Sequence, residues 1–319
     1  MLSAKYEIKL REQSKNFKFC EMRQHPAVRT SRPPADPAPQ CLLAEVLALA
    51  EAAGRAILAL YQRHQDGADA SVHLGGKDDG SPLTQADLAA HRVIEQGLRA
   101  LRPDWPVVSE EGRHAGPEPG GSCWLVDPLD GTREFLAGNG EFTVNIALVR
   151  GGVALWGVVH APALGESFWG GGGLGAWRHG HARGEAARVA IRVASAPEPA
   201  QVCRVIASRS HADPATQELL RGLGDIQALQ AGSSLKFCRV AQGLAHVYPR
   251  LAPTCHWDTA AGQAVLEGAG GCVLDLAGQP LRYPEAGGRL NPGFVAACAP
   301  LQQWRTGRAP RGSAGGVPA

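Results

Sequence analysis

The chain has 319 residues, 44% of them hydrophobic, which is enough for a sizeable core in one large domain or two. Its formal net charge of +2 gives no electrostatic reason to expect a nucleic-acid-binding or membrane-surface protein. The eight Cys form no C-x-x-C pair, so free thiols are expected rather than a zinc site or a disulfide framework. No apolar stretch reaches the roughly 18 to 20 residues that span a bilayer, so no transmembrane helix is expected.

Both ends of the chain are expected to be disordered extensions. Residues 1–40 are basic and then rich in Pro, and they lack the apolar segment of a signal peptide. Residues 301–319 contain the stretch TGRAPRGSAGGVPA, which consists mostly of small and polar residues. Ordered structure is therefore expected from about Cys41, in a protein of the cytoplasm.

The first half of the ordered chain, residues 41–195, begins with two predicted helices. Apolar residues recur at helical spacing from 41 to 64. After a loop rich in Gly, Asp and Pro, Thr84 and Asp87 have the spacing of a capping box, so a second helix is expected there, and Pro103 ends it. Strands are then expected at 106–112, 124–130, 143–152 and 153–162, with a helix entry at 131–135 and a glycine-linked hairpin at 166–180. Helices followed by meandering strands predict an α+β protein.

The second half, residues 196–300, follows a Pro- and Ala-rich boundary near 190–202. Helices and strands are closer to alternating here. The expected elements are a strand at 204–208, a helix within 209–224, a helix within 232–245, a strand at 246–250, a helix within 257–271, and closing strands within 272–283 and 293–298.

Two carboxylates, Asp127 and Asp130, end the apolar run WLVDPLD. Pro128 fixes one backbone angle between them, so both side chains can converge while the carbonyl of Leu129 is left free to bind a cation. Further acids stand at other strand and helix ends: Asp87, Glu110, Glu111 and Asp258. Several carboxylates share one pocket only when cations neutralise them, and hard oxygen ligands suit Mg²⁺.

The residues that follow these acids predict a phosphate site. Gly131 and Thr132 open a short helix, whose backbone N–H groups would face an anion. Two divalent cations held about 4 Å apart by carboxylates are a recurrent device for hydrolysing phosphate esters. We find no convincing Ser, Cys or His nucleophile motif in the sequence.

The set DPLDGT, an upstream EE and a downstream WDTAAG resembles the inositol monophosphatase-like superfamily of metal-dependent, lithium-sensitive phosphatases. The stretches DGSPLTQADLAAH, GTREFLAGNGEFTVNIALV, SRSHAD and GSSLKFCRVAQGLAHVYPR look like the CysQ-type 3'(2'),5'-bisphosphate nucleotidases. The resemblance covers about residues 42 to 300. It implies a layered α-β-α-β-α sandwich and removal of the 3'-phosphate of adenosine 3',5'-bisphosphate, giving AMP; 3'-phosphoadenylyl sulfate is a further candidate substrate.

The resemblance also implies a role for each matching residue. Two or three Mg²⁺ ions would be held by Glu110, Asp127, the carbonyl of Leu129, Asp130 and Asp258. Asp87 and Thr132, with Glu110, would orient and activate the attacking water, and Glu111 would stand behind these ligands or contact a third ion. The substrate would contact Gly131, Thr132, His211, Ser233, Lys236, Arg250 and Asp258.

Two other functions stay open at this point. The same metal site could hydrolyse inositol monophosphate or fructose 1,6-bisphosphate, or the chain could be a catalytically silent protein that binds phosphate or a nucleotide. Intact metal ligands disfavour the silent protein, and the cationic residues of the second half favour the nucleotidase. The expected partner is a small phosphate ester and not nucleic acid; the resemblance leaves open peripheral association with the cytoplasmic face of the inner membrane, and the oligomeric state is left open.

Overall fold

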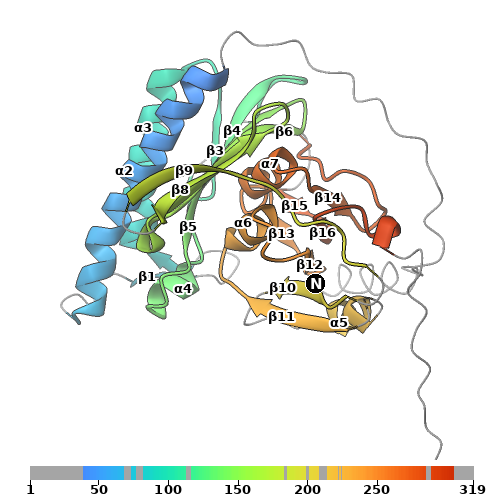
Figure 1. Cartoon of the computed structure of the whole chain (residues 1–319). Coiled ribbons are helices and arrows are strands. Elements are labelled where there is room, and N and C mark those ends of the chain that lie inside the picture. The colour runs from blue at the N-terminus through green and yellow to red at the C-terminus, as the bar shows by residue number, and fades with distance from the viewer. Residues whose placement is uncertain are drawn as a thin grey trace, which may run out of the picture.

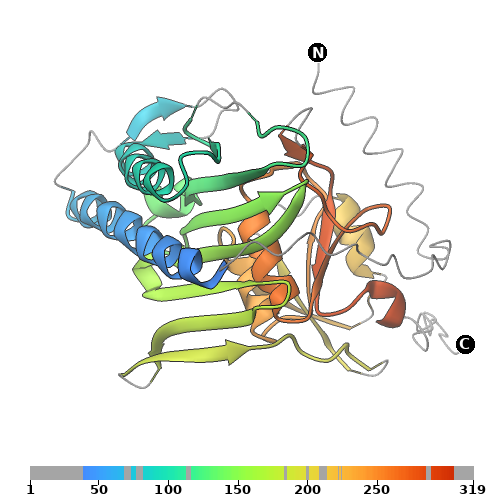
Figure 2. The ribbon, with the colours of Figure 1, turned by 90° about the horizontal axis from the view of Figure 1, so that it is seen from above.

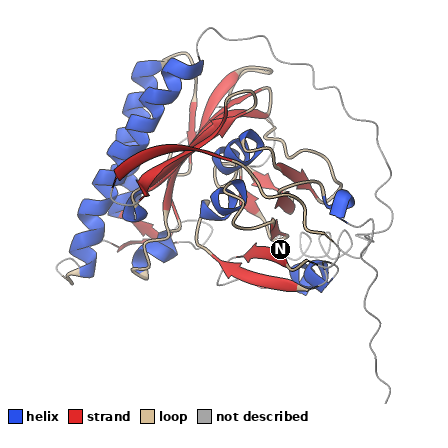
Figure 3. Cartoon of the chain, in the orientation of Figure 1, coloured by secondary structure: helices blue, strands red, loops and turns tan. Residues whose placement is uncertain are grey.

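The computed structural model describes residues 39–67, 73–76, 82–112, 116–182, 185–198, 201–207, 214–221, 223, 225–284 and 289–304. Its elements lie in layers, with helices outside and between two sheets (Figures 1 and 3). In the first half they are α2 (Pro39–Gln65), β1 (His73–Gly76), β2 (Pro82–Thr84), α3 (Gln85–Leu101), β3 (Val107–Ser109), β4 (Ser122–Asp130), α4 (Thr132–Leu136), β5 (Thr143–Arg150), β6 (Val153–Ala161), η2 (Pro162–Leu164), β7 (Glu166–Gly171), β8 (Gly175–Ala182) and β9 (Glu185–Ile191).

The first half forms a seven-stranded sheet in the order β3-β4-β5-β6-β7-β8-β9. Only the β3–β4 pair is parallel; the other neighbours are antiparallel. Side chains of β4 alternate between its faces, so Trp124 and Val126 pack with the α2 residue Ile57, while Cys123 and Leu125 pack on the opposite side. Helices α2 and α3 thus cover one face of this sheet (Figure 1).

The second half builds a five-stranded mixed sheet in the order β11-β10-β12-β16-β14. Helices α6 and α7 lie between the two sheets, and α5 lies beyond the second sheet (Figures 1 and 2). The elements are β10 (Cys203–Ala207), α5 (Pro214–Arg221), β11 (Ile226–Gln230), α6 (Leu235–Ala241), β12 (Val247–Arg250), β13 (Thr254–Cys255), α7 (Ala260–Gly268), β14 (Cys272–Asp275), β15 (Leu290–Asn291), β16 (Phe294–Ala297) and η3 (Leu301–Trp304). The layered α-β-α-β-α arrangement expected from the sequence is confirmed.

Close packing joins the two halves. A Cβ atom added at Gly157 on β6 would stand 2.6 Å from the Cα of Ala261, so this position needs glycine for α7 to approach the sheet. One hydrophobic cluster contains Leu125 and Phe168 of the first half together with Phe237 of the second. The boundary near residue 195 therefore separates the two sheets without dividing this cluster, and a division into domains there stays a prediction.

The structure corrects some boundaries and adds elements. Helix α2 begins at Pro39 rather than Cys41, and the predicted tail from 301 begins too early, because Leu301 and Trp304 are buried in η3. Strands β1, β2, β9, β11, β13 and β15 were not expected. β13 and β15 have two residues each, and most β11 side chains are exposed, so these three strands show no apolar pattern. The six Cys whose side chains the structure describes are free, and none of the described helices is long and apolar enough to cross a membrane.

Candidate active site

The Asp-Pro-Leu-Asp segment forms an irregular end of β4. The pairing of β4 with β5 shifts register between Asp127 and Asp130. Asp127 is buried, and its Oδ1 accepts a hydrogen bond of 3.1 Å from the backbone N–H of Leu129. Pro128 restricts the backbone between the two acids. The turn therefore holds two carboxylates and the buried Leu129 at one end of the seven-stranded sheet.

Asp87 and Thr132 meet beside this turn. Asp87 is fully buried at the third position of α3, where its Oδ2 accepts hydrogen bonds from the backbone N–H of Thr84 at 2.8 Å and from the Thr84 hydroxyl at 2.5 Å. The capping box expected from the sequence is present and fixes this carboxylate. The Thr132 Oγ1 lies 3.4 Å from Asp87 Oδ1 and 3.4 Å from the carbonyl oxygen of Leu129. Both distances are long for O–H···O bonds, so the hydroxyl keeps capacity for a tighter partner.

Glu110 stands in the turn that follows β3. Strand β3 runs parallel to β4, and the backbone N–H of Glu110 donates to the carbonyl of Val126 at 3.1 Å. The preceding residue, Ser109, is anchored to α3 because its Oγ lies 2.9 Å from the Nδ1 of His91. These contacts hold Glu110 next to the end of β4, with Glu111 directly after it.

Asp258 brings a further carboxylate from the second half of the chain. It lies just before α7, and its Oδ2 accepts a hydrogen bond of 2.7 Å from the backbone N–H of Cys255. Burial, followed by the negative charges of Asp130 and Glu110, raises the pKa of Asp258 well above its usual range. Acids from β4, the β3 turn and the start of α7 therefore act on one another at one place.

The acids fit a divalent cation chemically, although they are not drawn together into a tight cluster. Within the described ranges, no group of three or more His, Cys, Asp or Glu side chains is close enough to hold a metal ion. The oxygen donors of these acids, and the way the charges of Asp130 and Glu110 help to raise the pKa of the buried Asp258, fit an ion such as Mg²⁺.

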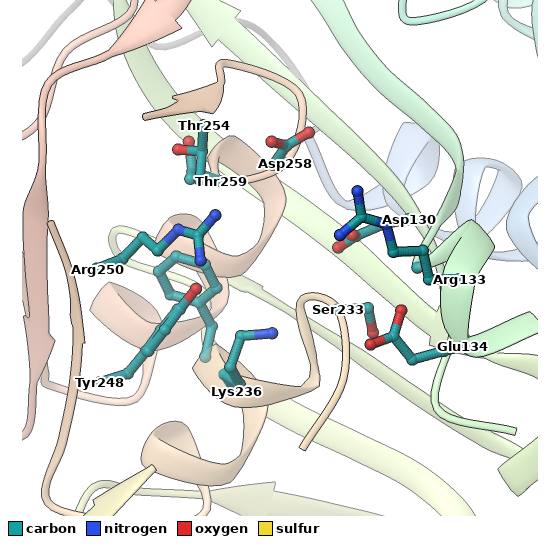
Figure 4. Close-up of a pocket in the computed structure, with 12 residues that line it drawn as sticks. Asp130, Arg133, Glu134, Ser233, Lys236, Tyr248, Arg250, Thr254, Asp258 and Thr259 are labelled. Atoms are coloured by element: carbon teal, nitrogen blue, oxygen red, sulfur yellow. The ribbon is translucent and has the colours of Figure 1, made fainter. Parts of the chain in front are cut away.

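A cavity of about 160 Å³ opens beside Asp130 and Asp258. Figure 4 shows Lys236 and Arg250 facing this cavity from the side opposite Asp130. Lys236 is only 6% exposed, and the structure gives its Nζ no hydrogen bond or ion pair with any described residue. Burial lowers the pKa of Lys236, which the charges of Asp130 and Glu134 partly offset.

Two further polar groups in the cavity wall lack partners. The Oγ of Ser233 and the Nε of Arg250 are buried and have no hydrogen-bond partner among the described residues. Ser233 also has a φ of 46°, the one positive φ found for a non-glycine residue of the described chain. Backbone strain and unpaired buried polar atoms cost stability, and they gather at sites that bind ligands. The second half therefore presents unpaired donors to a space whose other side is acidic.

The sequence analysis missed several residues that line the same cavity. The motif GTREF could have indicated Arg133 and Glu134, because the first turn of a helix that opens onto a site also exposes its second and third residues. Tyr248 lies in the quoted stretch GSSLKFCRVAQGLAHVYPR, on the predicted strand that became β12, but a tyrosine on a short strand shows no sign that it faces a cavity. The added lining residues are Arg133, Glu134, Phe237, Tyr248, Thr254 and Thr259.

The structure places the expected residues in two groups. Gly131, with a φ of 93° at the N-cap of α4, lines the cavity together with Asp130, Ser233, Lys236, Arg250 and Asp258. Asp87, Glu110, Glu111, Asp127, Leu129 and Thr132 lie behind or beside it, at the ends of α3, β3 and β4. His211 lies outside the described residues.

Known proteins resemble this chain over most of its length. The model of the Inositol monophosphatase family matches residues 39–305. The 3'(2'),5'-bisphosphate nucleotidase CysQ of Escherichia coli (strain K12) is 46% identical over 260 residues, which cover 79% of this chain and 98% of that protein. The crystal structure of CysQ from Bacteroides thetaiotaomicron is 36% identical with a TM-score of 0.67, and covers 81% of this chain and 97% of that one. The inositol monophosphatase of Anabaena is 25% identical with a TM-score of 0.63, over 82% of this chain and 92% of that one.

Proposed function

The chain belongs to the inositol monophosphatase family, and on that premise we propose that it is a metal-dependent phosphatase that removes the 3'-phosphate of adenosine 3',5'-bisphosphate, giving AMP and phosphate. The high identity to a nucleotidase of Escherichia coli over nearly that protein's whole length supports this substrate. The same site would accept 3'-phosphoadenylyl sulfate, which carries the same 3'-phosphate.

The observation that carries the proposal is the set of unpaired donors opposite the acids. The unpaired Arg250 Nε and Ser233 Oγ lie in the wall of one cavity with Asp130 and Asp258. Lys236 lines the same cavity, and its Nζ faces the Tyr248 ring without a hydrogen bond to a described residue. A substrate with a single phosphate at the metal site would leave the buried Lys236 and the buried Nε of Arg250 unused. A second phosphate satisfies them through charge-assisted hydrogen bonds, so the cavity suits a molecule with two phosphates.

The residues of the site would have different roles in the reaction. Glu110, Asp127, the Leu129 carbonyl, Asp130 and Asp258 would hold two or three Mg²⁺ ions, and Glu111 would support them from behind. Bound there, the ions would neutralise the phosphate charge and lower the pKa of water, so that it can lose a proton and act as the nucleophile near neutral pH. Thr132 Oγ1 would orient the attacking water, and Asp87, whose position its Thr84 hydrogen bonds fix, would take up the proton through that hydroxyl.

A related phosphatase activity is the second candidate. The inositol monophosphatase fold of the Anabaena protein shows that this architecture is shared with enzymes named for another substrate. Inositol monophosphate has no second phosphate for Lys236 and Arg250, whereas fructose 1,6-bisphosphate has one. Fructose 1,6-bisphosphate is therefore the stronger alternative to the nucleotide as a substrate. We also propose that the protein works in the cytoplasm on this small molecule, which the free thiols of the described Cys support.

Phosphate release from three substrates tests the proposal. Purified protein with Mg²⁺ would be assayed on adenosine 3',5'-bisphosphate, inositol 1-phosphate and fructose 1,6-bisphosphate, at matched concentrations. We expect the nucleotide to give the highest kcat/KM of the three substrates. Its margin over inositol 1-phosphate should be at least about tenfold, because that substrate lacks the second phosphate and each charge-assisted hydrogen bond lost costs about this much. A higher kcat/KM on either of the other two substrates would assign the chain to that activity instead.

A further inference from the structure

A chain of buried hydrogen bonds crosses the candidate site from one half of the protein to the other. The Nδ2 of Asn145 on β5 lies 3.1 Å from Asp130 Oδ2 and 2.9 Å from Ser234 Oγ. The Ser234 Oγ in turn lies 2.8 Å from the backbone carbonyl oxygen of Asp258. Asn145 is fully buried and Ser234 is 1% exposed. We call these linked groups the Asn145–Ser234 relay.

The direction of each hydrogen bond in the relay follows from its partners. The carbonyl of Asp258 can only accept, so the hydroxyl hydrogen of Ser234 is committed to it. The Ser234 oxygen must then accept from Asn145, and an ionised Asp130 must also accept. Both needs fall on the amide NH₂ group of Asn145, which has two hydrogens, one for each partner.

The other half of the same amide shows that stability alone does not explain Asn145. Its Oδ1 is buried and has no hydrogen-bond partner among the described residues. A buried acceptor without a partner is unfavourable, so an apolar side chain would suit a purely structural position better. The Asn145 amide supplies two hydrogen-bond donors at a place where the carboxylate of Asp130 must be held near that of Asp258.

The relay also joins elements that no short stretch of chain connects. Asn145 pairs with Asp127 in the β4–β5 register, and the shift after Asp127 brings Asp130 within its reach. Ser234 immediately precedes α6, and Asp258 lies two residues before α7. The relay therefore ties the acidic end of the first sheet to the loop that carries the acid of the second half.

We propose that Asn145 and Ser234 are positioning residues that set the spacing between Asp130 and Asp258, and so determine the affinity of the site for divalent cations. The proposal rests on the proposed function only in taking these two carboxylates as metal ligands. Without the relay, repulsion between the acids is free to move the Asp258 loop outward, and a cation must then draw it back at the expense of binding free energy.

Titration of metal-free protein with Mg²⁺ alone tests this, by isothermal titration calorimetry and by the rise in melting temperature that Mg²⁺ produces. The variants are Asn145→Ala, Asn145→Asp, Ser234→Ala and the double variant Asn145→Ala with Ser234→Ala. Asn145→Asp keeps the shape but replaces the NH₂ donors with an acid. Ser167→Ala is the matched control, because Ser167 is a buried hydroxyl whose partners are His160 at 2.9 Å and Glu51 at 3.5 Å rather than the candidate metal ligands.

We expect each relay variant to weaken Mg²⁺ binding about 10- to 100-fold, as loss of residues behind metal ligands does, while Ser167→Ala changes it less than about twofold. Because the relay acts as one unit, the double variant should lose no more than the weaker-binding single variant. Mg²⁺ affinities within twofold of wild type in Asn145→Asp and Ser234→Ala, or single losses that multiply in the double variant, would overturn the proposal.

These titrations test the role of the relay independently of the proposed substrate. Hydrolysis of a different phosphate ester by the wild type would refute the proposed substrate and leave the expected affinities unchanged. If Asn145→Ala does not fold, Asn145→Asp and Ser234→Ala decide the outcome, since each changes very few atoms. Wild-type protein that binds no Mg²⁺ would overturn both the metal assignment and the relay.

Discussion

Replacing Lys236 with Met should make the protein more stable and less selective at the same time. Lys236 is 6% exposed, and burial lowers its pKa. Its Nζ lies over the Tyr248 ring, 5.4 Å from the centroid, but has no hydrogen bond or ion pair with a described residue. Met has a similar length and no charge, so Lys236→Met removes the cost of keeping an unpaired ammonium away from water. Replacement of a whole buried ion pair by apolar groups can add about 1 to 4 kcal/mol to the free energy of unfolding. Lys236 is a single charge that nearby acids partly stabilise, so the expected gain is at the lower end, about 1 kcal/mol.

The effect of Lys236→Met on substrates should depend on the second phosphate. One charge-assisted hydrogen bond contributes about 1.5 to 3 kcal/mol, which corresponds to about a tenfold to a hundredfold loss of kcat/KM on adenosine 3',5'-bisphosphate. Adenosine 3'-monophosphate lacks the phosphate that Lys236 would bind, so its kcat/KM should change less than about threefold. Arg250→Met should show the same pattern.

Arg239→Met is the control for removal of a charge from the same helix. Arg239 is three residues beyond Lys236 on α6, but its guanidinium pairs with Glu166 at 2.9 Å, outside the cavity. This variant should lower stability and leave the ratio of the two kcat/KM values unchanged. Urea denaturation without substrate and initial rates on both substrates measure these effects. Equal losses on the two substrates in Lys236→Met, together with a loss of stability, would show that Lys236 supports the fold and would refute the reasoning.

Three further predictions concern the metal site and pH. Excess EDTA should abolish phosphate release and Mg²⁺ should restore it; full turnover in EDTA would contradict a metal-dependent reaction. Asp127→Asn should keep the circular dichroism spectrum, because its Oδ1 still accepts the Leu129 N–H, while activity falls by at least about a hundredfold; wild-type rates would remove Asp127 from the ligands. Burial lowers the pKa of His160 to about 4, so the unfolded state binds more protons below pH 6.5, and stability should fall as pH drops from 6.5 to about 4. This histidine accounts for about 3 kcal/mol of that fall, which urea titrations of His160→Gln should show as a shallower pH dependence.

The elements that the sequence could predict are those whose residues decide structure locally. Helical spacing of Val46, Ala50 and Ile57 defines the buried face of α2, and the Thr84–Asp87 cap marks the start of α3. Strand β11 escaped prediction because it is an edge strand whose exposed side chains carry no apolar pattern. Its place in the sheet comes from parallel pairing with β10, a contact between segments separated by α5.

In the candidate site, too, local motifs could be predicted from the sequence and contacts between distant segments could not. The acids could be named from DPLDGT, EE and WDTAAG, because short motifs at strand and helix ends carry them. Their supports could not be named, since Asn145 and Ser234 lie 89 residues apart and meet only in the folded chain. The strain at Ser233 was likewise hidden, because a serine in a left-handed conformation looks like any other serine in a sequence.

A competition between substrates in one tube tests the central claim most directly. Wild-type protein, Mg²⁺ and equal concentrations of adenosine 3',5'-bisphosphate and fructose 1,6-bisphosphate would be mixed, and both would be followed by chromatography. The ratio of their consumption rates is then the ratio of their kcat/KM values, free of errors in protein concentration. We predict that the nucleotide is consumed faster than the sugar bisphosphate, and that its product is AMP with the phosphate on the 5' carbon. Faster loss of the sugar, or formation of adenosine 3'-monophosphate, would contradict it.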